Sequence, residues 1–413
     1  EMQRSLVGSE MCIRDRYRLV WGRILFLLLL LSTFFSCILF FIIWSTFDNL
    51  DFDNRILLAL LSVFSLQFNA NNLMGQCLYT LRGTPIPFVV RTLVGGLIGI
   101  AVTFISIRYL RIGYLGFVLG SALNYMFCFF SFIYPLWMKE KLYPRIEISK
   151  VRIFKLLKIS LPVVPHALGF LLLSSSSRII MALYEIPIED IGIYSNGYIL
   201  GDYITIVTTA LAFALAPYMQ TTFRSENYMC YRFLFFLCQS IALVSIFIFC
   251  LWMPEIYSIL IRNESLQESM VISQISCFAN CVFPLYVFMS NICFIKKDTM
   301  QLLWLVFIPG LLNIILLLIF IPLFGYRVAV ITTLISYWTQ MFIPFFIRYY
   351  KEQISLWLGN RSKLVELFLI SVFALVTSII LSKYFMAKLS MTLLIMVIII
   401  SNISKISYKL KFL

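Results

Sequence analysis

The sequence predicts an all-α fold, a polytopic bundle of transmembrane helices. Hydrophobic residues make up 61% of the 413 residues, and charged residues only 13%. The apolar residues fall into about 12 runs of membrane-crossing length. A bilayer core of about 30 Å needs roughly 20 residues of helix, because no water inside it can satisfy an open backbone. The stretches between the runs are too short to hold a soluble domain with its own core.

The expected spans follow one another along the chain with short polar turns between them. A longer polar segment at residues 138–158 separates the first four spans from the remaining eight. The spans are predicted at residues 24–44, 56–81, 88–107, 114–137, 159–182, 193–217, 230–253, 270–295, 302–323, 328–346, 364–382 and 389–404.

The first sixteen residues do not fit this pattern. Residues 6–16, LVGSEMCIRDR, resemble the translation of a transposase-type sequencing adapter. We therefore interpret residues 1–16 as an artefactual, disordered tail. The alternative is a genuine polar tail. Three acidic and three basic residues of this segment cancel, so the formal net charge of +14 belongs to the rest of the chain.

The positions of lysine and arginine predict the orientation, since cytoplasmic loops retain positive charge. If the segment before the first span is cytoplasmic, that side carries 22 Lys or Arg residues and the other side seven. This topology explains the excess of basic over acidic residues. We predict no nucleic-acid partner, because the sequence carries no motif for binding RNA or DNA. The seven outer residues are Arg55, Arg108, Arg111, Arg262, Arg327, Lys383 and Lys388.

Two stretches carry recognisable motifs. The first, ISLPVVPHALGFLLLSSSSRIIMALY followed by IEDIGIYSNGYILGDY, has a Leu-Pro entry, a late arginine and Gly-x-Tyr-Ser, at Leu161, Pro162, Arg178, Gly192, Tyr194 and Ser195. The second, PGLLNIILLLIFIPLFGYRVAVITTLISYW, has an asparagine, Ile-Pro-x-x-Gly and Ile-Ser-Tyr, at Asn313, Ile321, Pro322, Gly325, Ile335, Ser336 and Tyr337.

These stretches resemble the polysaccharide-export flippases, the O-antigen or Wzx-type members of the multidrug/oligosaccharidyl-lipid/polysaccharide superfamily. The resemblance extends from residue 17 to about residue 350. Two departures stand out: the family's acid before the arginine is Ser177 here, and its second glycine after the turn is absent around residues 326–328.

The resemblance implies two pseudo-symmetric lobes around a central cavity, with about 12 visible spans of an expected 14. Because only four spans precede the central loop, we expect that the first two helices of the parent are missing. The expected domains are the tail 1–16, an incomplete N-lobe 17–137, a cytoplasmic linker 138–158, a C-lobe of six spans 159–350 and two additional C-terminal spans 351–413.

The second visible span is rich in amide side chains. At about 100° per residue, Gln67 and Asn71 share one helix face, while Asn69, Asn72 and Gln76 share another. So many amides cannot all face lipid. They either line a water-filled cavity that binds the sugar hydroxyls of a cargo, or they hold neighbouring helices together.

Two charged residues lie well inside predicted spans. Helical rise places Arg178 about 6 Å and Asp202 about 14 Å below the same membrane surface. Arg178 could snorkel outward as an anchor, pair structurally with Asp202, or present its charge to an anionic cargo with Asp202 nearby as a switch. We interpret His166, the only histidine, as a hydrogen-bonded packing residue rather than a proton relay.

We predict a transporter, not an enzyme, with no catalytic residue, no metal site and no cofactor. The resemblance implies that the cargo is an oligosaccharide on undecaprenyl diphosphate. This cargo would move from the inner to the outer leaflet of the bacterial cytoplasmic membrane by alternating access, for cell-surface polysaccharide assembly. Membrane lipids are the other expected partners. Arg178, Asp202 and the five amides are the substrate-binding candidates, and the structural motif positions are Pro162, Asn313, Pro322 and Gly325.

Two other functions stay open. A MATE-like multidrug or cation antiporter of the same superfamily would need acidic residues in its cavity, for which Asp202 is the candidate. A membrane-embedded polysaccharide polymerase would be expected to have a large outer loop, and an acyltransferase a catalytic histidine with polar partners. The outer loops are short and the histidine lies within a helix, so both enzymes are less favoured.

Overall fold

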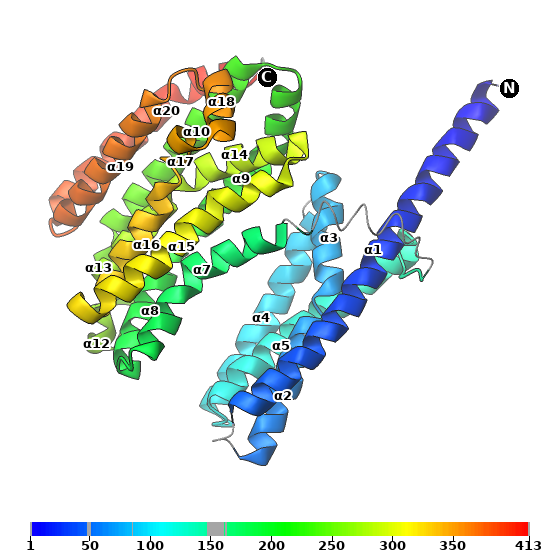
Figure 1. The fold of residues 1–413 in the computed structure, drawn as a ribbon, viewed down its shortest axis with the longest axis horizontal. Coiled ribbons are helices and arrows are strands. Elements are labelled where there is room, and N and C mark those ends of the chain that lie inside the picture. Colours follow the sequence, from blue (N-terminus) through cyan, green and yellow to red (C-terminus); the bar gives the residue numbers. More distant parts are fainter. Residues whose placement is uncertain (1, 48–50, 85, 147–160, 162, 412–413) are drawn as a thin grey trace. The chain divides into compact units, whose positions relative to one another are not determined.

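The fold is helical throughout the described chain (Figure 1). This confirms the all-α prediction. The chain divides into two compact units, Glu1–Ile153 and Phe154–Leu413. The predicted linker crosses this division, and most of it, like Pro162, lies outside the described residues. The computed structural model describes residues 2–47, 51–84, 86–146, 161 and 163–411.

Ten of the described helical segments are long and apolar enough to cross a membrane. They correspond to ten of the predicted spans. The spans predicted at 328–346 and 389–404 contain shorter apolar helices, Val328–Thr339 and Phe385–Val397. The chain is therefore a multi-pass membrane protein.

The first unit begins with a helix that extends well before the first apolar run. α1 starts at Met2, so the backbone of residues 2–16 is helical rather than the disordered tail that the sequence predicts. This segment contains no proline, so a helix can continue into it from the adjacent span. The helices of the unit are α1 (Met2–Thr46), α2 (Phe52–Gln67), α3 (Ala70–Leu81), α4 (Ile86–Arg108), α5 (Tyr114–Ile133) and the π-helix η1 (Tyr134–Lys139).

The amide-rich span, predicted as one helix over 56–81, is broken between α2 and α3. The amide nitrogen of Asn69 bonds the carbonyl oxygen of Leu66, three residues back, at 3.4 Å. This tight turn changes the helical phase between Gln67 and Asn71. Two of the amides therefore lie on either side of a backbone irregularity.

The second unit contains the remaining helices. Its elements are α7 (Val163–Leu183), α8 (Ile188–Asp202), α9 (Thr205–Arg224), α10 (Tyr228–Leu251), α11 (Met253–Leu260), α12 (Glu264–Gln267), α13 (Met270–Ala279), the 3₁₀ turn η2 (Asn280–Val282), α14 (Phe283–Lys296), α15 (Thr299–Phe324), α16 (Val328–Thr339), α17 (Ile343–Phe346), α18 (Arg348–Trp357), α19 (Ser362–Leu381) and α20 (Phe385–Lys411).

Predicted spans of this unit are also broken, and two of the breaks carry polar side chains that contact each other. The span at 193–217 divides into α8 and α9, and Asp202 is the last residue of α8. The span at 270–295 divides at η2, which begins with Asn280. Pro284, near the start of α14, has no N–H to donate to the preceding turn, which favours the break at η2. Asp202 and Asn280 thus both lie beside irregular backbone.

The centre of the second unit is the segment from α12 to α14. About 72% of its most apolar window is buried within the protein, against 6% for α4 in the first unit. Around this centre, α7 packs along α15 (Figure 1). Glycines permit that approach, because a Cβ atom added at Gly310 would lie 3.1 Å from the carbonyl oxygen of Gly169. The tight α7–α15 pair supports the α7 residues described next.

Candidate functional site

Arg178 lies on α7, somewhat more than one turn before that helix ends. Its Nε donates to Oγ of Ser195 on α8 at 3.1 Å, and its guanidinium carbon lies 5.3 Å from the centre of the Tyr198 ring. Tyr198 is farther than Ser195 from the loop that joins α7 to α8. The side chain of Arg178 therefore reaches along α8 toward the interior of the span, not outward as a snorkelling anchor would.

Asp202 lies on the same stripe of α8 as the two residues that Arg178 contacts. Ser195, Tyr198 and Asp202 follow an i, i+3, i+7 spacing, which places them on one helix face. Oδ1 of Asp202 accepts a hydrogen bond from Nδ2 of Asn280 at 3.2 Å. Arg178 and Asp202 form no direct ion pair with each other, both being described residues, so the structural pair is not present in this conformation.

The Asn280 contact has an electrostatic consequence. A carboxylate at the last residue of a helix lies at the negative end of the helix dipole, which is unfavourable. A hydrogen bond to a charged group contributes about 1.5–3 kcal/mol and offsets this cost. Asn280 therefore both orients and stabilises the Asp202 carboxylate.

Tyrosines and hydroxyl groups complete this cluster. Oγ of Ser177 and Oγ1 of Thr333 lie 3.4 Å apart, beside the buried hydroxyl of Tyr194. Tyr194 makes no hydrogen bond of standard geometry among the described residues. Tyr198 interacts with Tyr337 of α16. We call the whole set the Arg178 cluster: Ser177, Arg178, Tyr194, Ser195, Tyr198, Asp202, Asn280, Thr333 and Tyr337.

The motif residues of α15 and α16 hold the helices that carry this cluster. Asn313 is fully buried, and its Nδ2 donates to Ser176 Oγ at 3.1 Å while its Oδ1 accepts from Ser336 Oγ at 3.5 Å. Asn313 therefore joins α7, α15 and α16. Pro322 lies inside α15, and Gly325 ends that helix with a φ of +75°, a conformation that favours glycine.

In the first unit, two of the five amides connect helices. Oε1 of Gln67 accepts hydrogen bonds from Ser32 at 3.1 Å and Thr33 at 3.3 Å, both on α1. Asn71 is fully buried; its Nδ2 donates to the carbonyl oxygen of Phe129 and its Oδ1 accepts from Trp137 Nε1, both at 3.2 Å. The geometry of Gln67 and Asn71 fits helix-to-helix contact.

The other three amide side chains make fewer hydrogen bonds. Asn72 Nδ2 donates weakly to Asn69 Oδ1 at 3.4 Å, and the oxygen of Asn72 has no hydrogen-bond partner in the described ranges. Gln76 is half-buried, with no side-chain hydrogen bond to any described residue. Gln76 therefore keeps hydrogen-bonding capacity for a ligand, whereas the unpartnered oxygen of Asn72 is itself buried.

The remaining titratable candidate, His166, packs against aromatic side chains. His166 Nε2 lies 3.1 Å from the hydroxyl of Tyr286, and the two rings are stacked at 5.9 Å. In the described part of the chain, no group of three or more His, Cys, Asp or Glu side chains could hold a metal ion.

Sequence reasoning missed three members of the Arg178 cluster, Tyr198, Asn280 and Thr333. Tyr198 could have been found, since it lies between Ser195 and Asp202 at helical spacing. Asn280 could not, because 78 residues separate it from Asp202 and no local pattern links them.

Comparisons with known proteins bear on the fold. No family model and no curated protein matches this sequence. Several solved structures do. The outward-facing conformation of a multidrug resistance MATE family transporter of the MOP superfamily matches with a TM-score of 0.60 and 14% identity, over 79% of this chain and 77% of that chain.

Two further structures give similar values. MATE in the straight conformation has a TM-score of 0.61 and 15% identity, over 81% of this chain and 78% of that chain. A MOP superfamily transporter from Pyrococcus furiosus, described as having a binding pocket of reverse polarity, has a TM-score of 0.60 and 15% identity, over 81% and 79%. At such identities the likeness shows the fold and not the cargo. This chain has the two-lobed helical fold of the MATE transporters of the MOP superfamily.

Proposed function

We propose that this chain transports an anionic lipid-linked oligosaccharide across the membrane, with the Arg178 cluster as part of its cargo site. The observation that carries the proposal is the state of Arg178. Only its Nε makes a hydrogen bond to a described residue, and Asp202, the acid with which it interacts electrostatically, forms no ion pair with it. A charged arginine inside a span costs about 2.5–3.5 kcal/mol, and an anionic cargo would offset that cost.

The chemistry of the cluster suits a diphosphate with sugars attached. A guanidinium can donate two parallel N–H bonds to phosphate oxygens, and the two terminal nitrogens of Arg178 are the ones without partners in the described chain. The serine, threonine and tyrosine hydroxyl groups of the same cluster are donors and acceptors of the kind that bond sugar hydroxyls. We therefore propose an oligosaccharide on undecaprenyl diphosphate, in the bacterial cytoplasmic membrane, as the cargo.

The membrane potential is the expected driving force. Moving about two negative charges outward across 100 mV, inside negative, contributes about 4.6 kcal/mol. Flipping of the lipid-linked sugar in proteoliposomes should accelerate when a potassium diffusion potential makes the inside negative. An unchanged rate with the potential clamped at zero would contradict this coupling.

The direct test of the site is Arg178→Ala in the same flipping assay. Loss of charge-assisted hydrogen bonds worth about 1.5–3 kcal/mol should slow flipping by roughly 10- to 150-fold. Arg178→Lys keeps the charge but loses the bidentate geometry, so an intermediate rate is expected. The control is Arg327→Ala, which removes an exposed arginine paired with Glu268. If Arg178→Ala and Arg327→Ala flip equally fast, Arg178 is not in the cargo site.

A MATE-like cation antiporter is the second candidate, and Asp202 favours it. Its carboxylate accepts a bond from the neutral Asn280 and forms no ion pair with a described cation, so it could receive a proton, a sodium ion or an organic cation. The antiporter predicts proton- or sodium-driven efflux of an organic cation that Asp202→Asn abolishes. A chain that flips the lipid-linked sugar but shows no such efflux is not an antiporter.

The enzyme alternatives gain no support from the site. His166 contacts two aromatic side chains, Tyr286 and Phe170, rather than an acid or a nucleophile. Its hydrogen-bond partner is the hydroxyl of Tyr286, and no described carboxylate or serine bonds it. This environment, together with the transporter fold, favours transport.

A further inference from the structure

Arg178 and Asp202 carry opposite charges close together in the Arg178 cluster, yet they form no ion pair, both being described residues. The guanidinium of Arg178 lies over the Tyr198 ring, and Asp202 follows Tyr198 by four residues, about 6 Å along the axis of α8. The two charged groups interact electrostatically. Because opposite charges attract strongly where little water screens them, a specific contact must hold the carboxylate away from the guanidinium.

Asn280 makes that contact. Its Nδ2 donates to Oδ1 of Asp202 at 3.2 Å and to the carbonyl oxygen of Ser276 at 3.4 Å. The nitrogen of an amide side chain carries two hydrogens, so these two bonds use both of them. The Asn280 side chain is also buried, so water does not replace either partner. Asn280 therefore presents its donor to Asp202 in a fixed orientation.

The position of Asn280 follows from the sequence around it. Pro284, four residues later, has no N–H to donate to the Asn280 carbonyl oxygen as an α-helix would require. The N–H of Phe283 donates to that oxygen instead, and this bond across three residues forms the 3₁₀ turn η2. The turn therefore places the Asn280 side chain at the junction between α13 and α14.

Side chains of two neighbouring helices hold this turn in place. Nε2 of Gln239, on α10, donates to the carbonyl oxygen of Cys281 at 2.9 Å. Nε1 of Trp338, on α16, donates to the carbonyl oxygen of Phe278 at 3.1 Å. These two carbonyl groups lie on either side of Asn280 in the sequence, so the backbone at Asn280 is restrained by two other helices of the same unit.

The backbone of Asp202 is restrained as well. A Cβ atom added at the preceding residue, Gly201, would overlap the carbonyl oxygen of Ser273 on α13, so the end of α8 lies directly against that helix. With both backbones held, rotation about the side-chain bonds of Asp202 decides whether its carboxylate faces Asn280 or Arg178.

We propose that Asn280 is a positioning residue of the cargo site: it holds the Asp202 carboxylate away from Arg178, so that the terminal nitrogens of the guanidinium stay available to an anionic cargo. This inference rests on the proposed function and deepens it, because it names what sets the affinity of the site for an anion. Without the Asn280 donor, the carboxylate turns to Arg178 and neutralises its charge. A cargo phosphate then has to compete with Asp202 for the same guanidinium.

Calorimetric titration of the purified chain in detergent with farnesyl diphosphate, a short-chain lipid diphosphate, tests the proposal. Asn280→Leu keeps a side chain of similar size but removes the donor. If the Arg178–Asp202 ion pair then forms in about nine molecules of ten, the affinity for the probe falls about 10-fold. Adding Asp202→Asn removes the competing carboxylate, so the double variant should bind as tightly as the unaltered chain. Equal affinities of Asn280→Leu and the double variant would overturn the proposal.

The matched control is Gln239→Leu. Gln239 and Asn280 are both buried amides at the same turn, but Gln239 bonds a backbone carbonyl and not Asp202. Gln239→Leu should lower the melting temperature and leave the affinity for farnesyl diphosphate unchanged. A loss of affinity equal to that of Asn280→Leu would assign the effect to distortion of the turn and overturn the proposal. If Asn280→Leu does not fold, Asn280→Ala removes the same donor with a smaller side chain, and the same comparisons apply.

Arg178→Ala separates this inference from the proposed function. If Arg178→Ala binds the probe as tightly as the unaltered chain, Arg178 is not in the cargo site and both proposals fail. If Arg178→Ala weakens binding and Asn280→Leu does not, only the positioning role is wrong.

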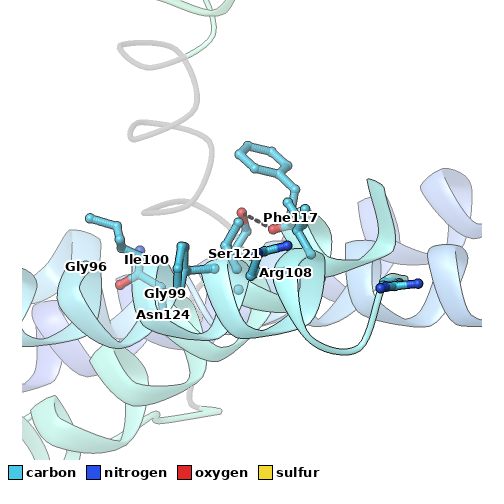
Figure 2. Close-up of a pocket in the computed structure, with 12 residues that line it drawn as sticks. Gly96, Gly99, Ile100, Arg108, Phe117, Ser121 and Asn124 are labelled. Carbon is cyan, nitrogen blue, oxygen red and sulfur yellow. Dashed lines mark hydrogen bonds between the residues drawn. The ribbon is translucent and has the colours of Figure 1, made fainter. Parts of the chain in front are cut away.

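Arg108→Ala is the control for where the probe binds. Arg108 lines a hollow between α4 and α5 of the first unit, shown in Figure 2, and no residue of the Arg178 cluster lines that hollow. Arg108→Ala should leave the affinity unchanged. A loss of affinity in Arg108→Ala but not in Arg178→Ala would place the bound probe outside the Arg178 cluster and contradict both proposals.

Discussion

At the residue scale, neighbouring amides of one predicted span have different roles. Asn71 is fully buried and uses both ends of its amide, to Phe129 and Trp137. Gln76, five positions along, is half-buried and makes no hydrogen bond to a described residue. A buried polar group without a partner costs about 1–3 kcal/mol, so these environments imply opposite sensitivities to substitution.

We predict that Asn71→Ala lowers stability and Gln76→Ala does not. Asn71→Ala leaves the Trp137 indole N–H without its acceptor, so the free energy of unfolding should fall by about 1–3 kcal/mol. Gln76→Ala should change it by less than about 0.5 kcal/mol. Thermal unfolding in detergent measures both, and equal melting temperatures would show that Asn71 is not a structural contact.

Under the proposed function, Gln76 is expected to affect the rate of transport rather than stability. Gln76→Ala should slow flipping of the lipid-linked sugar at unchanged melting temperature, because it removes a half-buried amide that bonds no described residue. A flipping rate equal to that of the unaltered chain would remove Gln76 from the cargo site.

At the scale of elements, α8 is held against α13 by close backbone contact. A Cβ atom added at Gly197 would lie 2.6 Å from the carbonyl oxygen of Ser269, which precedes α13. Ser273 of α13 donates to the carbonyl oxygen of Gly197 at 2.8 Å. These contacts fix the face of α8 that carries Ser195, Tyr198 and Asp202.

Two glycines of α8 give a matched test of that contact. Gly197→Ala should destabilise the protein by about 1–3 kcal/mol, because backbone and Ile272 must shift to make room. Gly192→Ala meets no atom and removes a flexible residue from a helix, so it should stabilise by about 0.5–1 kcal/mol. If the free energy of unfolding changes in the same direction in both variants, α8 and α13 are not tightly packed.

At the scale of the whole molecule, a buried ion pair attaches the C-terminal helix to the rest of the second unit. Lys388 of α20 bonds the carboxylate of Glu255 on α11, and its Nζ lies 5.6 Å from the Trp252 ring. The Lys388 side chain is only 3% exposed and that of Glu255 is 34% exposed. Removing one partner of such a pair leaves the other charge incompletely solvated.

We predict that Lys388→Met weakens the attachment of α20. The loss should be about 1–3 kcal/mol, less than for a fully buried pair because Glu255 is partly exposed. Adding Glu255→Gln should recover most of it, since no charge then remains to be buried. Limited proteolysis between α19 and α20 reports the attachment. The control is Glu352→Ala, which removes an exposed ion pair with Arg348. If Lys388→Met is cleaved no faster than Glu352→Ala, the prediction is contradicted.

The fold class could be determined from the sequence, whereas the roles of the polar residues could not. A helix that crosses a bilayer satisfies its backbone by itself, so the length of an apolar run sufficed to predict ten of the 12 spans. The breaks at Asn69 and Asp202 were not predictable in the same way. They involve local turns within apolar runs that continue on both sides.

The sequence by itself determined that this is a chain of many membrane-crossing helices, and it marked Arg178 and Asp202 as exceptions within apolar runs. Only the tertiary structure decided that Arg178 points along α8 to Tyr198, that Asp202 bonds Asn280 rather than Arg178, and that Gln67 and Asn71 connect helices. The physical reason is distance along the chain: backbone hydrogen bonds in a helix close within four residues, but a buried side chain finds its partner wherever the packing places one.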